Sequence, residues 1–485
     1  MKNGFDNDKY LKMQSEHIRE RIAKFGDKLY LEFGGKLFDD YHASRVLPGF
    51  MPDSKMQMLL TMKEDAEIVI AISAGAIASG KMRGDYGITY DQDVLRLMDI
   101  FQKLGLYVGS VCITQYTGEA AADRFREKLK GLGIKSYILR RIEEYPDNVE
   151  HIISDEGFGK NDYIETSRPL VVITAPGPGS GKMATCLSQL YHENKRGVRA
   201  GYAKFETFPI WNLPLKHPVN LAYEAATADL ADINIIDPFH LEAYGETTVN
   251  YNRDVEIFPV LRGIFEEIYG ECPYQSPTDM GVNMAGNCIF DDEAVCEAAR
   301  QEIIRRYYDE VCKLKAGTGS RSAVKKLESL LKQAGVTVSD RSVVKGALVR
   351  EEATGKPAAA IELPDGMIMT GKTSELLGAP AATLLNALKE IAGVDHKKHV
   401  ISPEALAPIT RLRTKFLGSS DPTLHCDEVL TALSISSAES EDAKAALEAL
   451  PQLRDLEMHS TRILPASDAD ILRRLHIRLT CEPQS

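Results

Sequence analysis

The 485-residue sequence has no apolar run long enough to cross a bilayer, which takes about 18 residues. Its longest largely apolar stretch is "IVIAISAGAIA", and the N-terminal "MKNGFDNDKYLKMQSEHIRERI" lacks the apolar core of a signal peptide. It also lacks an excess of basic residues, because 70 acidic residues outnumber 58 basic ones and give a net charge of −12. Such a charge opposes adhesion to nucleic acid and to anionic membranes. We therefore expect a cytoplasmic protein that binds neither nucleic acid nor membrane.

Several sequence patterns of known chemistry are also missing. The eight cysteines form no Cys-x-x-Cys pair, and no ligand spacing argues for a zinc site. In a chain without a secretory signal we expect the cysteines to be reduced and buried. The Gly-x-Ser-x-Gly turn of serine hydrolases and the His-Glu-x-x-His helix of zinc proteases are absent. Acyl transfer by a serine triad and zinc proteolysis therefore have no support in the sequence.

The length of the chain predicts more than one domain, because a single hydrophobic core rarely organises so many residues. Between residues 67 and 200, short apolar runs alternate with amphipathic segments, which predicts a parallel α/β sheet buried on both faces. We predict a P-loop-like or Rossmann-like phosphate-binding region over 1–288, a helical segment over 289–335 and a smaller α/β domain over 336–485. In the smaller domain, "KPAAAIELPDGMIMTGKTSELL" predicts a strand, an Asp-Gly turn and a strand.

Two of the expected strands run into loops that contain the same tetrapeptide, Ser-Gly-Lys-Met. "EIVIAI" is followed by a loop over 75–81, and "PLVVITA" by "PGPGSGKM" over 176–183. Both loops have the outline of G-x-x-x-x-G-K-[ST], in which backbone N–H groups and a lysine hold phosphate. The residues expected to bind phosphate are Gly75, Ser79, Gly80 and Lys81 in the first loop, and Gly177, Gly179, Ser180, Gly181 and Lys182 in the second.

Both loops depart from that pattern in the same way. Met82 and Met183 stand where the pattern has the hydroxyl that helps to hold Mg²⁺. The N–H groups of the first loop are all available. In the second loop, which has the better strand and helix around it, Pro176 also takes the first glycine position, and Pro176 and Pro178 remove two N–H donors. The shared departure favours binding of ATP or another phosphate ligand without that hydroxyl. The alternative is that both loops are glycine-rich turns that only let a helix pack on the sheet.

We expect the apolar run "INII" to be a strand that continues the alternation of strands and helices. Asp237 ends this run, as a Walker-B aspartate would, and is the candidate for holding Mg²⁺ if the ion takes part. With Lys182 and His240 it completes the set of candidate catalytic residues. Two structural alternatives stay open. Asp237 can cap a helix that begins at Pro238, and His240 can be a buried histidine without a catalytic role.

Polar segments follow the second loop along the chain. They contain Lys204, Glu206 and His217, then Arg253 and Asp254, then "SPTDMGVN". Ligands of parallel α/β sheets bind beyond the carboxyl ends of the strands, on loops of this kind. We therefore expect these segments to receive a second substrate, with an irregular structural connection as the alternative.

The repeated "SGKM", together with "KFETFPIWNLPLKHPVNLAYEAATADL" and "NIIDPFHLEAYGETTVNYNRDVEIFPVL", resembles domain-of-unknown-function family 1846, also called uncharacterised protein family 0371. The resemblance covers essentially the whole chain. It implies a cytoplasmic bacterial protein with an α/β N-terminal portion, a helical insert and a smaller α/β C-terminal portion, and it carries over no catalytic residues. "AAAIELPDGMIMTGKTSELL" also resembles the start of cytidine-deaminase-like folds. It lacks their zinc-binding residues, which implies a role in oligomerisation or substrate closure.

These observations together predict an enzyme that binds a nucleotide or another phosphorylated small metabolite. The expected reactions are phosphoryl transfer and ATP-dependent ligation, with Lys182 neutralising phosphate charge. Two other functions stay open: a metabolite-binding regulatory protein without catalysis, and a structural homo-oligomer whose glycine loops serve packing.

Overall fold

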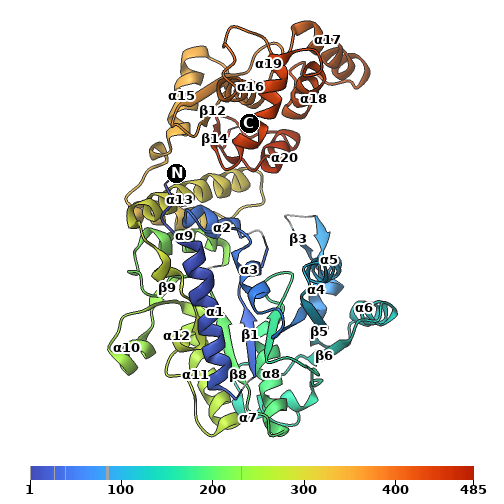
Figure 1. Ribbon diagram of the computed structural model, residues 1–485, viewed down its shortest axis with the longest axis vertical. Helices are drawn as coiled ribbons and strands as arrows, with labels where there is room; N and C mark the ends of the chain where they lie inside the picture. The colour runs from blue at the N-terminus through green and yellow to red at the C-terminus, as the bar shows by residue number, and fades with distance from the viewer. Residues whose placement is uncertain are drawn as a thin grey trace. The chain divides into compact units, whose positions relative to one another are not determined.

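The computed structural model describes residues 2–26, 28–35, 37–38, 40–83, 87–230 and 232–484. The chain divides into two compact units, which are drawn in one colour ramp in Figure 1. The N-terminal unit consists of Lys2–Glu224 and Asp232–Ala299, and the C-terminal unit of Ala225–Ala231 and Arg300–Ser485. Within the described ranges, no helix combines the length and the apolar character that a membrane span requires.

The N-terminal unit is built on a seven-stranded sheet in which every neighbouring pair of strands is parallel. This confirms the predicted α/β class with a parallel sheet. The strands are rich in Val, Ile and Leu, and five of them are buried along their whole length, as a sheet covered on both faces requires. The strands are β1 (Leu29–Phe33), β2 (Ala66–Ser73), β5 (Tyr107–Tyr116), β6 (Ser136–Arg140), β7 (Leu170–Thr174), β8 (Gly201–Phe205) and β11 (Gly281–Val282).

The strand order across this sheet is β11-β8-β1-β7-β2-β5-β6. From β2 the chain moves outward to β5 and β6, then returns to form β7 on the other side of β2 and continues to β8 and β11. The direction of winding therefore reverses between β2 and β7. In open parallel sheets this reversal leaves a crevice outside the carboxyl ends of the two strands, where ligands bind.

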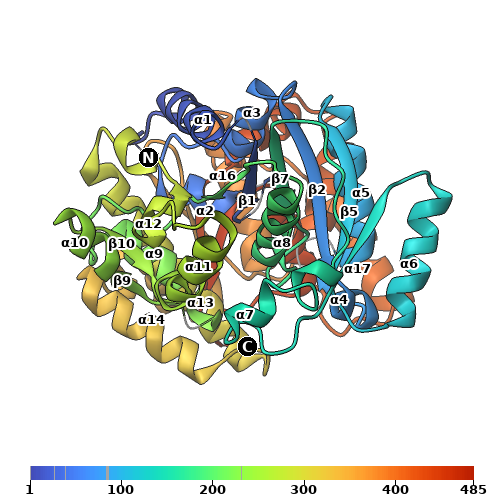
Figure 2. The same ribbon diagram turned by 90° about the horizontal axis from the view of Figure 1, so that it is seen from below.

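Helices cover both faces of the sheet beside β1 and β8. On one face, α8 (Lys182–Lys195) and α11 (Asn252–Tyr269) lie side by side in both views of the ribbon (Figures 1 and 2). On the other face lie α1 (Asn7–Lys24) and α3 (Ser54–Thr61), with the Lys55 ammonium 5.8 Å from the centroid of the Phe205 ring. The remaining helices that begin in this unit are α2 (Tyr41–Val46), α4 (Ala74–Ala78), α5 (Tyr90–Lys103), α6 (Ala120–Gly131), α7 (Val149–Ile152), α9 (Pro218–Ala226), α10 (Pro238–Tyr244), α12 (Pro277–Met280) and α13 (Asp292–Lys315), with short turns η1 (Phe158–Lys160) and η3 (Ala285–Cys288).

Two small antiparallel ladders stand outside the main sheet, β3 (Met82–Arg83) with β4 (Ile88–Thr89) and β9 (Asn234–Ile236) with β10 (Val249–Tyr251). The expectation that "INII" continues the parallel alternation is therefore wrong. Its three-residue strand pairs with the segment just after α10, because the side chain of Asp237 begins that helix at once and the chain turns back.

The C-terminal unit contains a four-stranded sheet with the order β13-β12-β14-β15. The predicted strand, Asp-Gly turn and strand are confirmed as β12 (Ala358–Glu362) and β13 (Ile368–Lys372), which pair antiparallel. Strand β12 is also antiparallel to β14 (Glu457–Ser460), and β14 is parallel to β15 (Arg478–Cys481), so this sheet is mixed. Its helices and short turns are η2 (Ala228–Leu230), α14 (Arg321–Ala334), η4 (Val338–Asp340), α15 (Ser342–Thr354), α16 (Ala379–Ile391), α17 (Pro403–Arg411), η5 (Leu412–Phe416), α18 (Cys426–Ser436), α19 (Glu441–Glu448), η6 (Leu450–Leu453) and α20 (Ala466–Arg474). Its core gathers apolar side chains of β12, β14 and helices α16 and α18–α20, among them Ile361, Leu384, Leu433, Met458 and Leu472.

Candidate functional site

The second Ser-Gly-Lys loop joins β7 directly to α8 at the carboxyl edge of the parallel sheet. Gly179 and Gly181 adopt left-handed backbone angles, with φ of 75° and 76°, and Gly181 is the N-cap of α8. Lys182 is therefore the first residue of that helix, and its side chain is partly exposed. A helix of 14 residues that starts here directs its first N–H groups and the positive end of its dipole toward the loop.

Strand β5 holds the second loop in place through its backbone carbonyls. The Thr114 hydroxyl donates to the carbonyl of Ser180 at 2.8 Å, and the Gln115 amide donates to that of Gly179 at 3.4 Å. In a trans peptide the N–H points opposite to the C=O, so the N–H groups of Ser180 and Gly181 point away from β5. Within the described ranges, the N–H groups of Gly179, Ser180 and Gly181 have no acceptor. These are the three donors that the sequence predicted for phosphate.

The first Ser-Gly-Lys loop differs from its prediction. It begins as the short helix α4, and the Ser73 hydroxyl caps it by accepting the N–H of Ala76 at 3.3 Å. The following N–H groups donate to carbonyls within the same turn: Ser79 to Gly75, Gly80 to Ile77 and Lys81 to Ala76. The expectation that all its N–H groups are available is therefore wrong, because a side-chain cap turns the segment into helix. What this loop offers an anion is the exposed side chain of Lys81.

The two loops meet at one tyrosine. They follow β2 and β7, which are neighbours in the sheet, so both emerge at the point where the winding reverses. The Lys81 ammonium lies 5.1 Å from the centroid of the Tyr90 ring. The hydroxyl of the same ring occupies the space that a Cβ on Gly177 would need. Gly177 is therefore required by the close approach of Tyr90, which lies between the loops.

A buried cluster of charged side chains lies at the carboxyl end of β8, one strand beyond β1. The ammonium of Lys204 is 2.8 Å from Glu206 Oε1 and also donates to Asp254 and to the Tyr251 hydroxyl. Asp254 and Tyr251 come from the start of α11, which packs over this face of the sheet. All three charged side chains are nearly inaccessible to solvent. The structure thus brings together residues from two of the polar segments that the sequence singled out.

Burial and mutual charge shift the protonation of this cluster. Burial raises the pKa of Glu206 to about 7, although the Lys204 ammonium acts to lower it. Burial alone would lower the pKa of Lys204, but the carboxylates of Asp254 and Glu206 outweigh it and hold that pKa well above its usual value. Glu206 is therefore a carboxyl group that exchanges its proton near neutral pH beside a permanent cation, as a general acid or base does.

Glu32 belongs to β1, the strand between β8 and β7. Its Cα is in register with Ile173 of β7 on one side and Lys204 of β8 on the other, so it shares their face of the sheet. The Tyr202 hydroxyl donates to Glu32 Oε2 at 2.8 Å. The Cys186 thiol on α8 lies within electrostatic range of both Glu32 and Lys182. The sequence did not single out Glu32, because it looks like one polar residue in a short apolar strand.

The structure places Asp237 and His240 away from the two Ser-Gly-Lys loops. Asp237 is the N-cap of α10, where its carboxylate accepts the N–H groups of Phe239 and His240 and, at 2.6 Å, the Thr278 hydroxyl. This is the helix-cap alternative that the sequence left open, and both carboxylate oxygens have protein donors. His240 Nδ1 lies 2.9 Å from the Ser276 hydroxyl. In both ribbon views α10 lies apart from α4 and α8, so neither residue joins the loops (Figures 1 and 2).

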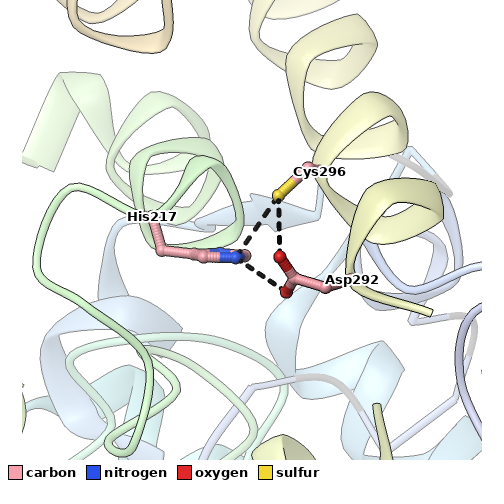
Figure 3. A group of neighbouring side chains, drawn as sticks. All are labelled: His217, Asp292 and Cys296. Carbon is pink, nitrogen blue, oxygen red and sulfur yellow. Dashed lines mark hydrogen bonds and ion pairs between the residues drawn. The ribbon is translucent and has the colours of Figure 1, made fainter. Parts of the chain in front are cut away.

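A third group of side chains has the composition of a metal site. His217, which precedes α9, faces Asp292 and Cys296 on the first turns of α13 (Figure 3). His217 Nε2 lies 3.0 Å from Asp292 Oδ1 and 3.3 Å from Cys296 Sγ. The sequence contained only the i, i+4 spacing of Asp292 and Cys296 as a signal, since His217 is 75 residues away from Asp292. No zinc-ligand spacing rule covers such a separation.

Comparison with known proteins gives matches along the whole length of the chain. Residues 3–335 match the family model described as "Domain of unknown function DUF1846, N-terminal", and residues 339–485 match the corresponding C-terminal model. A UPF0371 protein of Streptococcus pyogenes serotype M28 is 57% identical over 99% of this chain and 97% of its own length. UPF0371 proteins of Streptococcus thermophilus and Streptococcus pneumoniae are also 57% identical, over 99% of this chain and 98% of theirs. These descriptions state no activity.

Proposed function

We propose a function for this chain, which belongs to the DUF1846 family: it is an enzyme that binds the phosphate group of a small metabolite between its two Ser-Gly-Lys loops. The observation that carries the proposal is the position of the loops on β2 and β7, the neighbouring strands between which the sheet reverses its winding. Sheets of this kind bind ligands in that crevice. The ligand is a nucleotide or another phosphorylated metabolite, and the protein acts in the cytoplasm.

The two loops have different tasks in this proposal. The N–H groups of Gly179, Ser180 and Gly181 hold phosphate oxygens together with the start of α8, because they have no acceptor within the described ranges. Lys182 neutralises phosphate charge at the same place. Lys81 approaches from the first loop as a second cation, oriented by the Tyr90 ring. Neither loop offers a hydroxyl for Mg²⁺ at the usual position, so we expect phosphate binding without the ion.

The catalytic part of the proposal rests on the cluster at the end of β8. A buried carboxyl group whose pKa is raised to about 7 is suited to proton transfer at cellular pH. Glu206 is that group, and Lys204 beside it compensates the charge that remains after proton loss. Proton transfer from a nucleophile is the step that phosphoryl transfer and ATP-dependent ligation share. A second substrate on the loops beside this buried cluster would meet the phosphorylated one along the same edge of the sheet.

The binding step is tested with inorganic pyrophosphate, ATP and a sugar phosphate, each with and without Mg²⁺, in a thermal unfolding assay. A ligand at 100 times its Kd stabilises the folded chain by about 2.7 kcal/mol. Lys182→Ala should weaken the binding about 10- to 100-fold with little change in the melting temperature of the unliganded chain. The control is Lys195→Ala at the other end of α8, where the side chain is exposed. Equal binding by the two variants, or no effect of any phosphate on the wild type, would refute the proposal.

Turnover separates the enzyme from a metabolite-binding regulatory protein. Release of inorganic phosphate or of the nucleoside diphosphate from a stabilising ligand, in the presence of candidate acceptors, should depend on Glu206. Glu206→Gln keeps the size of the side chain and removes its titration. It should therefore bind the phosphorylated ligand as the wild type does and lose turnover. A ligand that binds at Lys182 without any turnover would favour the regulatory alternative.

A further inference from the structure

His217, Asp292 and Cys296 form a compact group that the phosphate site does not use. Asp292 and Cys296 lie one turn apart on α13, and His217 reaches them from the segment before α9 (Figure 3). The His217 side chain is buried to about nine-tenths, whereas Asp292 is exposed over 66% of its side chain. The group thus has a fixed imidazole on the protein side and a carboxylate on the solvent side.

The two contacts of His217 Nε2 match the spacing of ligand atoms around a small tetrahedral ion. Bond lengths of about 2.0–2.3 Å to nitrogen, oxygen and sulfur hold the ligand atoms of such an ion about 3.3–3.6 Å apart. Here His217 Nε2 lies 3.0 Å from Asp292 Oδ1 and 3.3 Å from Cys296 Sγ. The sulfur lies 3.7 Å from the other carboxylate oxygen, Oδ2, and one ligand atom of each residue lies within 4.8 Å of the others. The two distances from Nε2 are each within about 0.3 Å of what the ion would require. We propose that His217, Asp292 and Cys296 bind one divalent transition-metal ion of the zinc class.

The donor set selects the class of ion. A thiolate and an imidazole prefer Zn²⁺ or Co²⁺, whereas Mg²⁺ and Ca²⁺ take oxygen ligands in larger number. Three protein ligands leave one tetrahedral position, which water fills on the side of the exposed Asp292. The ion is thus distinct from any Mg²⁺ that accompanies a phosphorylated ligand.

The competing explanation is a catalytic triad, but the three side chains do not have the geometry of a triad. In a triad the nucleophile and the carboxylate bond to opposite nitrogens of the imidazole. Here Cys296 and Asp292 both approach Nε2, while Nδ1 accepts the N–H of Val219 at 3.3 Å. Binding an ion through Nε2 moves the imidazole proton to Nδ1, so the long contact with Val219 is given up.

The full chain is first stripped of metal ions with a chelator and dialysed. It is then titrated with Co²⁺ chloride, followed by Zn²⁺ chloride. We expect one Co²⁺ per chain, a thiolate-to-cobalt charge-transfer absorption in the near ultraviolet, and displacement of Co²⁺ by Zn²⁺. Cys296→Ser should abolish this absorption, and Asp292→Asn should weaken binding by at least about tenfold. The matched control is Cys312→Ser, which changes another partly buried cysteine further along α13.

Each outcome decides the proposal. Absence of Co²⁺ uptake by the wild type, or a thiolate absorption that survives Cys296→Ser or disappears in Cys312→Ser, would overturn it. Asp292→Asn keeps the test independent of folding, because the exposed Asp292 side chain contributes little to the core. The melting temperature of this variant can be compared with that of the wild type. Pyrophosphate binding through Lys182 should be the same in all these variants.

Discussion

The Lys81 ammonium lies over the ring of Tyr90, at 5.1 Å from its centroid. The Tyr90 hydroxyl fills the space beside Gly177, so this one ring contacts both loops that carry Ser-Gly-Lys. A displacement of this ring would therefore disturb both the position of the Lys81 amino group and the packing against Gly177. We expect the two loops to act as one anion site.

Gly177→Ala tests this coupling. A Cβ at this position collides with Tyr90, and overpacking of this kind costs about 1–3 kcal/mol in the free energy of unfolding. We expect weaker binding of pyrophosphate, because the ring that orients Lys81 has to move. Adding Tyr90→Phe removes the nearest clashing atom and should restore part of both the stability and the affinity.

The control for this prediction is Gly131→Ala. Gly131 ends α6, and a Cβ there meets no atom within 4 Å. It should not lower the urea midpoint, because alanine is the better helix former, and it should leave pyrophosphate affinity unchanged. If Tyr90→Phe restores nothing in the Gly177→Ala background, the ring does not couple the loops.

Lys204 is predicted to be essential for the stability of the N-terminal unit. Lys204→Met leaves the carboxylates of Asp254 and Glu206 buried without their cation, and breaking a buried pair in this way costs about 3–5 kcal/mol. Trp211 is the only tryptophan and packs against Gly281 of the same unit, so its fluorescence in urea follows this unit. Lys103→Met is the control, because its pair with Asp99 is exposed and is worth at most about 0.5 kcal/mol. Equal effects of the two substitutions would contradict the prediction.

Glu206 makes the stability of the same unit depend on pH. Its pKa in the folded chain is about 7 and its ordinary value is 4.5, so the folded state holds the proton more tightly between these values. Stability from this group is present below pH 4.5 and is lost as the pH rises to 7. Relative to Glu206→Gln, the wild type should lose on the order of 3 kcal/mol across this interval. Urea unfolding followed by Trp211 fluorescence at several pH values measures this loss. If the stability of the wild type relative to Glu206→Gln stayed constant or grew as the pH rises, the raised pKa would not belong to Glu206.

The sequence predicted the parts of this site that depend on local signals. An apolar run followed by glycines and a lysine identifies the ends of β2 and β7, since strand and turn residues are adjacent in the chain. It could not predict that these strands are neighbours, because strand order depends on contacts between distant segments. The helical turn at Ala74–Ala78 also escaped prediction, because a single serine cap decided how its N–H groups are used.

The buried charged cluster is the other part of the site that the sequence could not predict. Lys204, Glu206 and Asp254 were recognised as polar segments after the second loop, but only the packing of α11 on β8 shows that they form one buried cluster. Glu32 was missed for the same reason, since its partners Tyr202 and Lys204 belong to another strand. A polar side chain looks the same in a sequence whether it faces water or a partner across the sheet. The boundaries predicted at residues 288 and 335 stay predictions.

Asp237 provides the sharpest test of the alternatives that the sequence left open. As the cap of α10 it accepts two backbone N–H groups and the Thr278 hydroxyl, so Asp237→Ala leaves these donors buried without a partner. We expect a loss of about 1–2 kcal/mol in the free energy of unfolding, as for other helix caps, measured in urea by Trp211 fluorescence. Pyrophosphate affinity, with or without Mg²⁺, should not change, because α10 lies apart from the loops. Asp237→Asn retains one capping oxygen and should recover most of the stability. If either substitution instead abolished a Mg²⁺-dependent gain in affinity while stability was kept, Asp237 would be a metal ligand and its capping role secondary.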